Sequence, residues 1–155
     1  RSSIIRALIE MGDVVDAAEL LGRPYHVVGT VVEGDKRGRT IGFPTANLQI
    51  ASTKLLPVNG VYATWAYLED HPKRAVFASV TNIGVRPTVD GRHLRVEPYL
   101  IDFPAPEMSD DLYGQTIRLE FVVRLRGEQR FPNLTALIEQ IGLDVEAARH
   151  ALKTQ

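Results

Sequence analysis

The chain has 155 residues, of which 45% are hydrophobic and 24% are charged, and its formal net charge at pH 7 is -1. These values are typical of a globular domain with a sizeable core, and the near-zero charge argues against a general nucleic-acid binder. The sequence contains no cysteine, which excludes disulfides, thiolate metal sites and cysteine catalysis and fits a cytoplasmic protein.

The first segment, residues 3–22, has the pattern of two short helices. Apolar residues recur at helical spacing until Gly12 interrupts them. Asp13 is suited to cap a second helix, which Gly22 closes before Pro24 forces the chain out of helical geometry. The pair could cap the domain or connect it to something upstream. We favour a connector, because the chain begins with Arg and not with Met.

From residue 25 to residue 126 the pattern is that of β-strands. Runs rich in β-branched and aromatic residues are separated by turn residues, and they cover residues 25–33, 60–69, 74–83, 92–103 and 115–126. The last run alternates from Ile117 to Val123, which predicts that its four apolar residues share one face. Several strands with short turns and few helices between them predict an antiparallel barrel or a closed sandwich.

The end of the chain is helical again. Asn133 is suited to cap a helix that we expect to end at Gly142, and Asp144 is suited to cap a second helix that reaches Leu152. The apolar stripes of both helices are typical of core packing and not of a cofactor site.

The most informative stretch is the loop that leads to Asn47. It contains the glycines Gly34, Gly38 and Gly42 and the cations Lys36, Arg37 and Arg39. Glycine lets backbone N–H groups turn toward an anion, and the cations add to the positive field, so the loop is suited to a phosphate. The alternative is an ordinary surface turn closed by local hydrogen bonds.

The residues after this loop have the spacing of two metal ligands. Pro44 disfavours a helix before it, so the chain is expected to be extended there, and Thr45 and Asn47 then face the same side. A hydroxyl and an amide oxygen are neutral ligands, suited to a Mg²⁺ ion that arrives bound to a nucleotide.

Glu97 is the candidate for acid–base chemistry. It lies within residues 94–101, a mostly apolar run in which a lone carboxylate costs free energy unless it is paired or functional. With a nucleotide at the loop, it could serve as a general base. The alternative, equally open from these residues, is a structural ion pair with Arg86, Arg95 or Arg126.

A second cluster follows the longest predicted strand. Arg126 and Phe131 are close in sequence, and an arginine with an aromatic ring can clamp a planar polar ligand. The alternative is a solvated turn anchored by the phenylalanine. Residues 110–114, Asp-Asp-Leu-Tyr-Gly, likewise allow two interpretations: their carboxylates could help to hold a metal, or they could form a solvated loop.

Seven short motifs stand in an order typical of one enzyme family. They are Gly38-Arg39-x-x-Gly42-Phe43-Pro44-Thr45-Ala46-Asn47-Leu48, Gly60-Val61-Tyr62-Ala63, Asn82-Ile83-Gly84-x-Arg86-Pro87-Thr88, Val96-Glu97, Asp102-Phe103, Leu112-Tyr113-Gly114 and Leu125-Arg126-x-Glu128-x-x-Phe131. From about residue 21 to its end, the chain therefore resembles the riboflavin kinases. Residues 2–25 also resemble the joint of bacterial bifunctional enzymes, in which an FMN adenylyltransferase module precedes the kinase.

This resemblance implies a fold and an activity. The fold would be mainly β, a six-stranded antiparallel Greek-key barrel with flanking N- and C-terminal helices, divided into a helical connector (1–22) and a kinase domain (23–155). The activity would be transfer of the ATP γ-phosphate to the riboflavin 5′-hydroxyl, giving FMN, the first step of FAD synthesis. Mg²⁺ would accompany ATP or ADP, the full-length chain would carry an FMN adenylyltransferase module, and neither nucleic acid nor a membrane is expected as a partner.

The resemblance also assigns roles by matched position. Glu97 would be the catalytic base, and Thr45 and Asn47 would hold Mg²⁺. The nucleotide would lie near Gly34, Arg39, Thr45, Asn47, Tyr99, Asp102 and Tyr113, and the flavin near Arg126, Gln129 and Phe131. The sequence departs from the family at Tyr99, where many members have His, and at Pro98, which in a strand interior indicates an edge or a bulge.

Three functions remain in competition: a Mg²⁺-dependent riboflavin kinase, a non-catalytic flavin or nucleotide-binding module, and a small nucleic-acid-binding barrel. The near-zero charge weighs against the third, and the joint presence of Thr45, Asn47 and Glu97 weighs against the second. The kinase hypothesis requires these three side chains to converge on one pocket at the mouth of the barrel.

Overall fold

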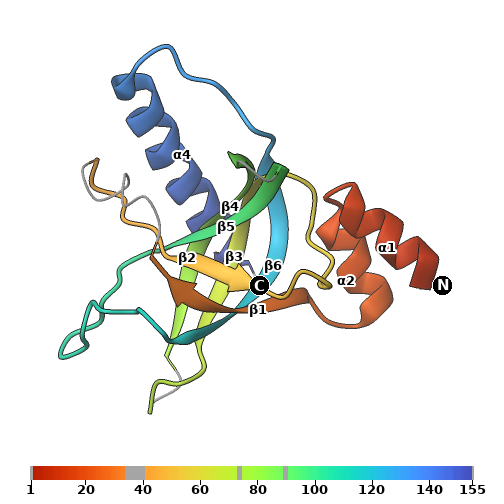
Figure 1. The fold of residues 1–155 in the computed structure, drawn as a ribbon, viewed down its shortest axis with the longest axis horizontal. Helices are drawn as coiled ribbons and strands as arrows, with labels where there is room; N and C mark the ends of the chain where they lie inside the picture. The colour runs from red at the N-terminus through yellow and green to blue at the C-terminus, as the bar shows by residue number, and fades with distance from the viewer. Residues whose placement is uncertain (1, 34–40, 73–74, 89–90, 155) are drawn as a thin grey trace.

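Six antiparallel strands form a closed barrel in the computed structural model, which describes residues 2–33, 41–72, 75–88 and 91–154 (Figure 1). The strands are β1 (Tyr25–Val32), β2 (Asn47–Ile50), β3 (Gly60–Leu68), β4 (Val76–Thr88), β5 (Gly91–Leu100) and β6 (Thr116–Arg126). The helices are α1 (Ser2–Glu10), α2 (Val14–Leu21) and α4 (Leu134–Lys153). Among the described residues, no helix has both the length and the apolar character needed to span a membrane.

The order of the strands around the barrel is β1-β2-β5-β4-β3-β6. The strands β3, β4 and β5 are consecutive neighbours, and β6 returns to lie beside β3, which is the Greek-key arrangement. The predicted fold class is therefore confirmed. The extended stretch expected after Pro44 forms the short strand β2, whose register with β5 is a single pair, Leu48 with Val96.

Two hydrophobic clusters follow from the alternation of side chains along the strands. The cluster inside the barrel includes Val27, Val31, Leu48, Tyr62, Ile83, Val96, Ile117, Leu119 and Phe121. The second cluster joins the outer face of the barrel to α4 and consists of Val61, Ala63, Val80, Ile101, Val145, Ala148 and Leu152. Helix α4 therefore covers one side of the barrel.

The predicted N-terminal helix pair is confirmed and packs on another side of the barrel from α4 (Figure 1). The Asp13 carboxylate accepts the backbone N–H of Asp16 at 3.1 Å, and Gly22 adopts the left-handed conformation with φ of 77°. Val14 is fully buried and belongs to the cluster inside the barrel. The helices thus contribute to the barrel core.

The two C-terminal helices predicted to meet between Gly142 and Asp144 are one continuous helix, so the predicted break is wrong. Asn133 does cap its start, since its side-chain oxygen accepts the N–H of Ala136 at 2.9 Å. A glycine in a helix interior costs about 1 kcal/mol relative to alanine. Burial of the next turns against the barrel offsets this cost, and the Asp144 carboxylate binds Arg126 instead of capping a helix.

Strand β6 contains two register shifts against β3, typical of β-bulges. After the first shift Val123 packs against the outer cluster, so the prediction that it shares a face with Ile117 and Phe121 is wrong. The second separates Arg124, which lies against Gly60, from Arg126, which points to α4. In a regular strand these two arginines would face the same side.

Candidate active site

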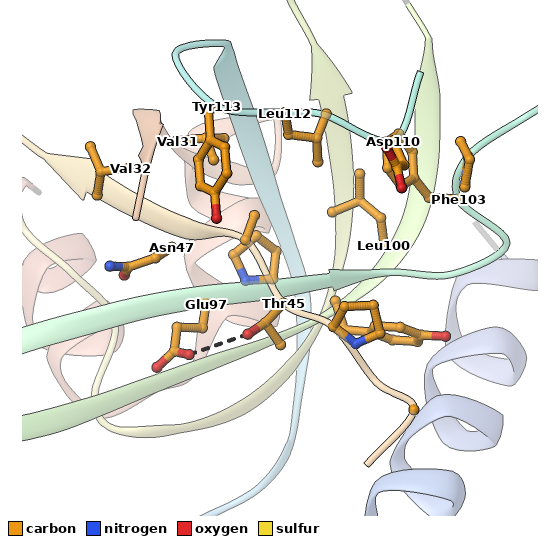
Figure 2. Close-up of a pocket in the computed structure, with 16 residues that line it drawn as sticks. Val31, Val32, Thr45, Asn47, Glu97, Leu100, Phe103, Asp110, Leu112 and Tyr113 are labelled. Carbon is orange, nitrogen blue, oxygen red and sulfur yellow. Dashed lines mark hydrogen bonds between the residues drawn. The ribbon is translucent and has the colours of Figure 1, made fainter. Parts of the chain in front are cut away.

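Thr45 and Glu97 meet where β2 begins beside β5. The hydroxyl of Thr45 donates a hydrogen bond to Oε2 of Glu97 at 3.3 Å, although the residues are 52 positions apart in sequence (Figure 2). The backbone fixes this approach, because the N–H of Ala46 donates to the carbonyl of Pro98 at 2.9 Å. Pro98 itself lies where the pairing of β5 with β2 ends, a position that tolerates a residue without an N–H.

Asn47 lines the same pocket as Thr45 and Glu97. Its side-chain amide donates to the carbonyl of Glu33 at 3.3 Å, so its carbonyl oxygen keeps its capacity to accept. The expected convergence of the three side chains is therefore confirmed.

The donor set at this point suits one kind of metal. Thr45 and Asn47 offer two neutral oxygens, and within the described ranges no group of three or more His, Cys, Asp or Glu side chains could hold an ion. Such a pair fits a Mg²⁺ ion that takes the rest of its ligands from water and phosphate, and does not fit a permanently bound metal.

The Glu97 carboxylate has a second partner. Nη1 of Arg95 lies 3.4 Å from Oε1 of Glu97, whose side chain is 19% exposed. The ion pair considered as an alternative is thus present with Arg95, while Arg126 pairs elsewhere. Within the described part of the chain, Thr45 contacts one carboxylate oxygen and Arg95 the other, and a carboxylate oxygen with one such contact can still accept from a further proton donor.

A pocket of about 460 Å³ opens beside these residues (Figure 2). Its polar residues are Thr45, Asn47, Glu97, Tyr99, Asp110 and Tyr113, and its apolar residues include Val31, Val32, Leu100, Phe103, Pro104 and Leu112. Apolar walls with a small number of polar groups among them are typical of small-molecule sites.

A second pocket, of about 620 Å³, lies between the barrel and α4. Its apolar residues are Phe43, Val61, Val80, Phe131, Leu137 and Ile141, and its polar residues include Asn82, Arg126, Glu128, Gln129 and Asp144. All three residues predicted to contact a flavin, Arg126, Gln129 and Phe131, line this second pocket.

The two pockets share a wall. Thr45, Glu97 and Tyr99 line both of them, and the ring of Tyr99 packs edge-on against Phe43 with centroids 5.4 Å apart. A group bound in one pocket and a group bound in the other would therefore approach each other at the Glu97 carboxylate. This is the arrangement that a transfer between two bound molecules requires.

The remaining predicted residues are placed differently. Tyr113 lines the first pocket, but Asp102 lines neither pocket. Asp102 binds Arg149 of α4 with an Oδ2–Nη1 distance of 3.0 Å, and this hydrogen-bonded guanidinium lowers the pKa of the carboxyl below its usual range. Gly34 and Arg39 lie outside the described residues.

The sequence assigns no ligand contact to four polar residues of the second pocket, Asn82, Glu128, Arg130 and Asp144. Asn82 and Glu128 stand within the quoted motifs, and Asp144 was assigned to a helix cap. Asn82 lies opposite Glu97 in the register of β4 with β5, which no pattern in the sequence could supply.

Sequence comparisons point to one family. Residues 21–152 match the family model Flavokinase, described as riboflavin kinase. The chain is 40% identical over 148 residues to the bifunctional riboflavin kinase/FMN adenylyltransferase of Haemophilus influenzae and 40% identical over 147 residues to that of Bacillus subtilis. These matches cover 96% and 95% of this chain but 45% of each relative, so the chain spans less than half their length.

Solved structures share the fold. The crystal structure of riboflavin kinase from Trypanosoma brucei has a TM-score of 0.59 and 26% identity, covering 84% of this chain and 78% of that one. A crystal structure from Streptococcus pneumoniae described as a macrolide-efflux protein has a TM-score of 0.86 and 34% identity, covering 96% of this chain and 46% of that one. The family assignment rests on the sequence matches and not on that description.

Proposed function

The chain belongs to the riboflavin kinase family, and we propose that it transfers the γ-phosphate of ATP to the 5′-hydroxyl of riboflavin, which yields FMN and ADP. The observation that carries the proposal is the wall of Thr45, Glu97 and Tyr99 between the two pockets. Phosphoryl transfer depends mainly on positioning and on neutralisation of charge, so the acceptor and donor sites must meet at the reacting groups.

The first pocket is assigned to ATP. Its apolar residues suit the adenine ring, and Thr45 and Asn47 line it together with Glu97. A bound Mg²⁺ would be held by Thr45 Oγ1 and Asn47 Oδ1 and would neutralise charge on the phosphates. Contacts of Gly34, Arg39 and Asp102 with the nucleotide stay predictions.

The second pocket is assigned to riboflavin. The isoalloxazine ring is planar, uncharged and mostly apolar, with polar groups along one edge. Phe131 and Phe43 supply aromatic surface, while Arg126 and Gln129 supply hydrogen-bond donors. This assignment places the ribityl chain near the shared wall.

In the proposed reaction, Glu97 accepts the proton of the riboflavin 5′-hydroxyl. The hydroxyl oxygen forms a bond to the γ-phosphorus while the bond from that phosphorus to the β–γ bridging oxygen breaks, and ADP leaves. Thr45 and Arg95 hold one carboxylate oxygen each, so they orient Glu97 before the substrates arrive.

We also propose that residues 1–22 connect the kinase to an FMN adenylyltransferase module, as the names and the greater length of the bifunctional relatives suggest. Such a module would use the FMN made here. A cytoplasmic location is part of the same proposal.

The decisive experiment is incubation of the protein with riboflavin, ATP and Mg²⁺, followed by chromatographic detection of FMN. We expect FMN to form only when Mg²⁺ is present. Riboflavin or ADP binding without FMN would favour the non-catalytic module instead. Binding of single-stranded nucleic acid without either small molecule would favour the third hypothesis.

A further inference from the structure

Helix α4 brings a buried carboxylate to the second pocket. Asp144 is 5% exposed and lines that pocket. Its carboxylate accepts hydrogen bonds from Arg126: Nε donates to Oδ1 at 3.0 Å and to Oδ2 at 3.2 Å, and Nη2 donates to Oδ2 at 2.9 Å. This is the bidentate geometry that fixes the plane of a guanidinium as well as its position.

Two further hydrogen bonds fix this ion pair, one to the Asp144 carboxylate and one from the Arg126 guanidinium. Nε2 of Gln140, one turn earlier on α4, donates to Oδ1 of Asp144 at 2.9 Å. Nη1 of Arg126 donates to the carbonyl of Gly127 at 3.1 Å. The guanidinium is therefore held along two edges, and the carboxylate that holds it is itself held by an amide.

The fixed guanidinium lies beside the ring of Phe131, which we assign to the flavin pocket. Cζ of Arg126 is 5.7 Å from the centroid of the Phe131 ring. The second bulge of β6 directs Arg126 outward, and the ion pair then closes the 18-position span from Arg126 to Asp144, which includes Phe131. Leu137 and Ile141 of α4 line the same pocket.

We propose that Asp144, supported by Gln140, is a positioning residue of the acceptor pocket. It holds Arg126 next to Phe131, and the two together form the surface that takes a planar, uncharged heteroaromatic ring. The inference rests on the proposed function, because it assigns that ring to riboflavin.

Stability alone does not account for this arrangement. A buried ion pair contributes little relative to apolar side chains of similar volume, because both charges lose their hydration. What the pair adds is a fixed direction for the guanidinium. It also leaves no uncompensated charge beside an uncharged ring, since the charge of Arg126 is matched by that of Asp144.

The test measures the affinity of the D144N variant for riboflavin. Binding is monitored by the quenching of riboflavin fluorescence, in the presence of Mg-ADP. We expect the dissociation constant for riboflavin to rise at least about tenfold, because the loss of one charge-assisted hydrogen bond changes an affinity by that factor. The KM for riboflavin should rise in parallel, while the KM for ATP stays near the wild-type value. The matched control is E146Q, which removes a carboxylate two residues away whose side chain is 75% exposed, and which should bind riboflavin as the wild type does.

A double variant, R126M with D144L, separates positioning from folding. It replaces both charges by apolar groups, so its thermal midpoint should stay near the wild-type value while its riboflavin affinity stays low. Wild-type riboflavin affinity in D144N or in the double variant would overturn the inference and leave the kinase proposal standing. A wild-type protein that neither binds riboflavin nor forms FMN would overturn the kinase proposal itself.

Discussion

Glu97 lies between a hydroxyl and a guanidinium, each near a different oxygen of its carboxylate. Replacement by glutamine keeps the shape of the side chain but removes the capacity to take a proton from an alcohol. We expect E97Q to lower turnover at least about tenfold, since a positioned base typically contributes ~10²–10⁴-fold. The affinity for ADP should not change. Steady-state FMN formation and an ADP titration check both parts, and unchanged turnover would remove Glu97 from the mechanism.

Thr45 offers its proton to Glu97 and its lone pairs to the pocket. T45A and N47A each remove one proposed Mg²⁺ ligand, so we expect each to weaken Mg-ADP binding while changing metal-free ADP binding less. T45S, which keeps the oxygen, is the matched control. Calorimetry with and without Mg²⁺ provides the measurement. Wild-type Mg-ADP affinity in both alanine variants would refute the ligand assignment.

At the residue scale, the sequence predicts what depends on local geometry. An extended chain after Pro44 predicts that Thr45 and Asn47 face the same side. The mostly apolar run around Glu97 marks its carboxylate as paired or functional. Asn82 and Asp144 depend on strand register and on the docking of α4, which neither periodicity nor spacing determines.

At the scale of the elements, local sequence signals also fail to predict the C-terminal helix as one continuous element. Glycine and aspartate close together are a sound local signal for a helix end followed by a cap. In the folded chain, Asp144 accepts hydrogen bonds from Nε and Nη2 of Arg126, and the next turns bury Val145 and Ala148. Long-range contacts therefore override the local preference, as they also do at the bulges of β6.

Gly142 consequently leaves α4 below its attainable stability. Among the described residues, a Cβ at Gly142 would meet no atom within 4 Å beyond its chain neighbours and the backbone of its own helix, and the backbone there is helical. We expect G142A to raise the free energy of unfolding by about 0.5–1 kcal/mol. Urea denaturation measures this change.

Gly22 is the control for that substitution. A Cβ there is equally unobstructed, but φ is +77°. G22A should lower the free energy of unfolding by about 1 kcal/mol, because an alanine in the left-handed region is strained. An increase of similar size in both variants would show that the helical conformation of Gly142 is not the cause.

At the scale of the whole molecule, the question is whether the N-terminal helix pair and the barrel unfold as one unit. The N–H of Val58 donates to the carbonyl of Ile9 at 3.3 Å, and Val14 packs into the cluster inside the barrel. Gly12, at the turn between α1 and α2, lies against Val58 and Arg124. These contacts are those of a cap on the barrel, even if the same helices also connect it to another module.

Gly12 provides the test. A Cβ there would lie 2.8 Å from Cγ1 of Val58 and 2.9 Å from Cδ of Arg124, and φ is +83°. We expect G12A to lower the free energy of unfolding by about 2 kcal/mol or more, since strain and overpacking act together. Trp65, the single tryptophan, is on β3 and reports on the barrel in a fluorescence-monitored urea titration. If the helices were only a connector, the Trp65 transition of G12A would coincide with that of the wild type. A transition shifted to lower urea would show that the helix pair stabilises the barrel that holds both pockets.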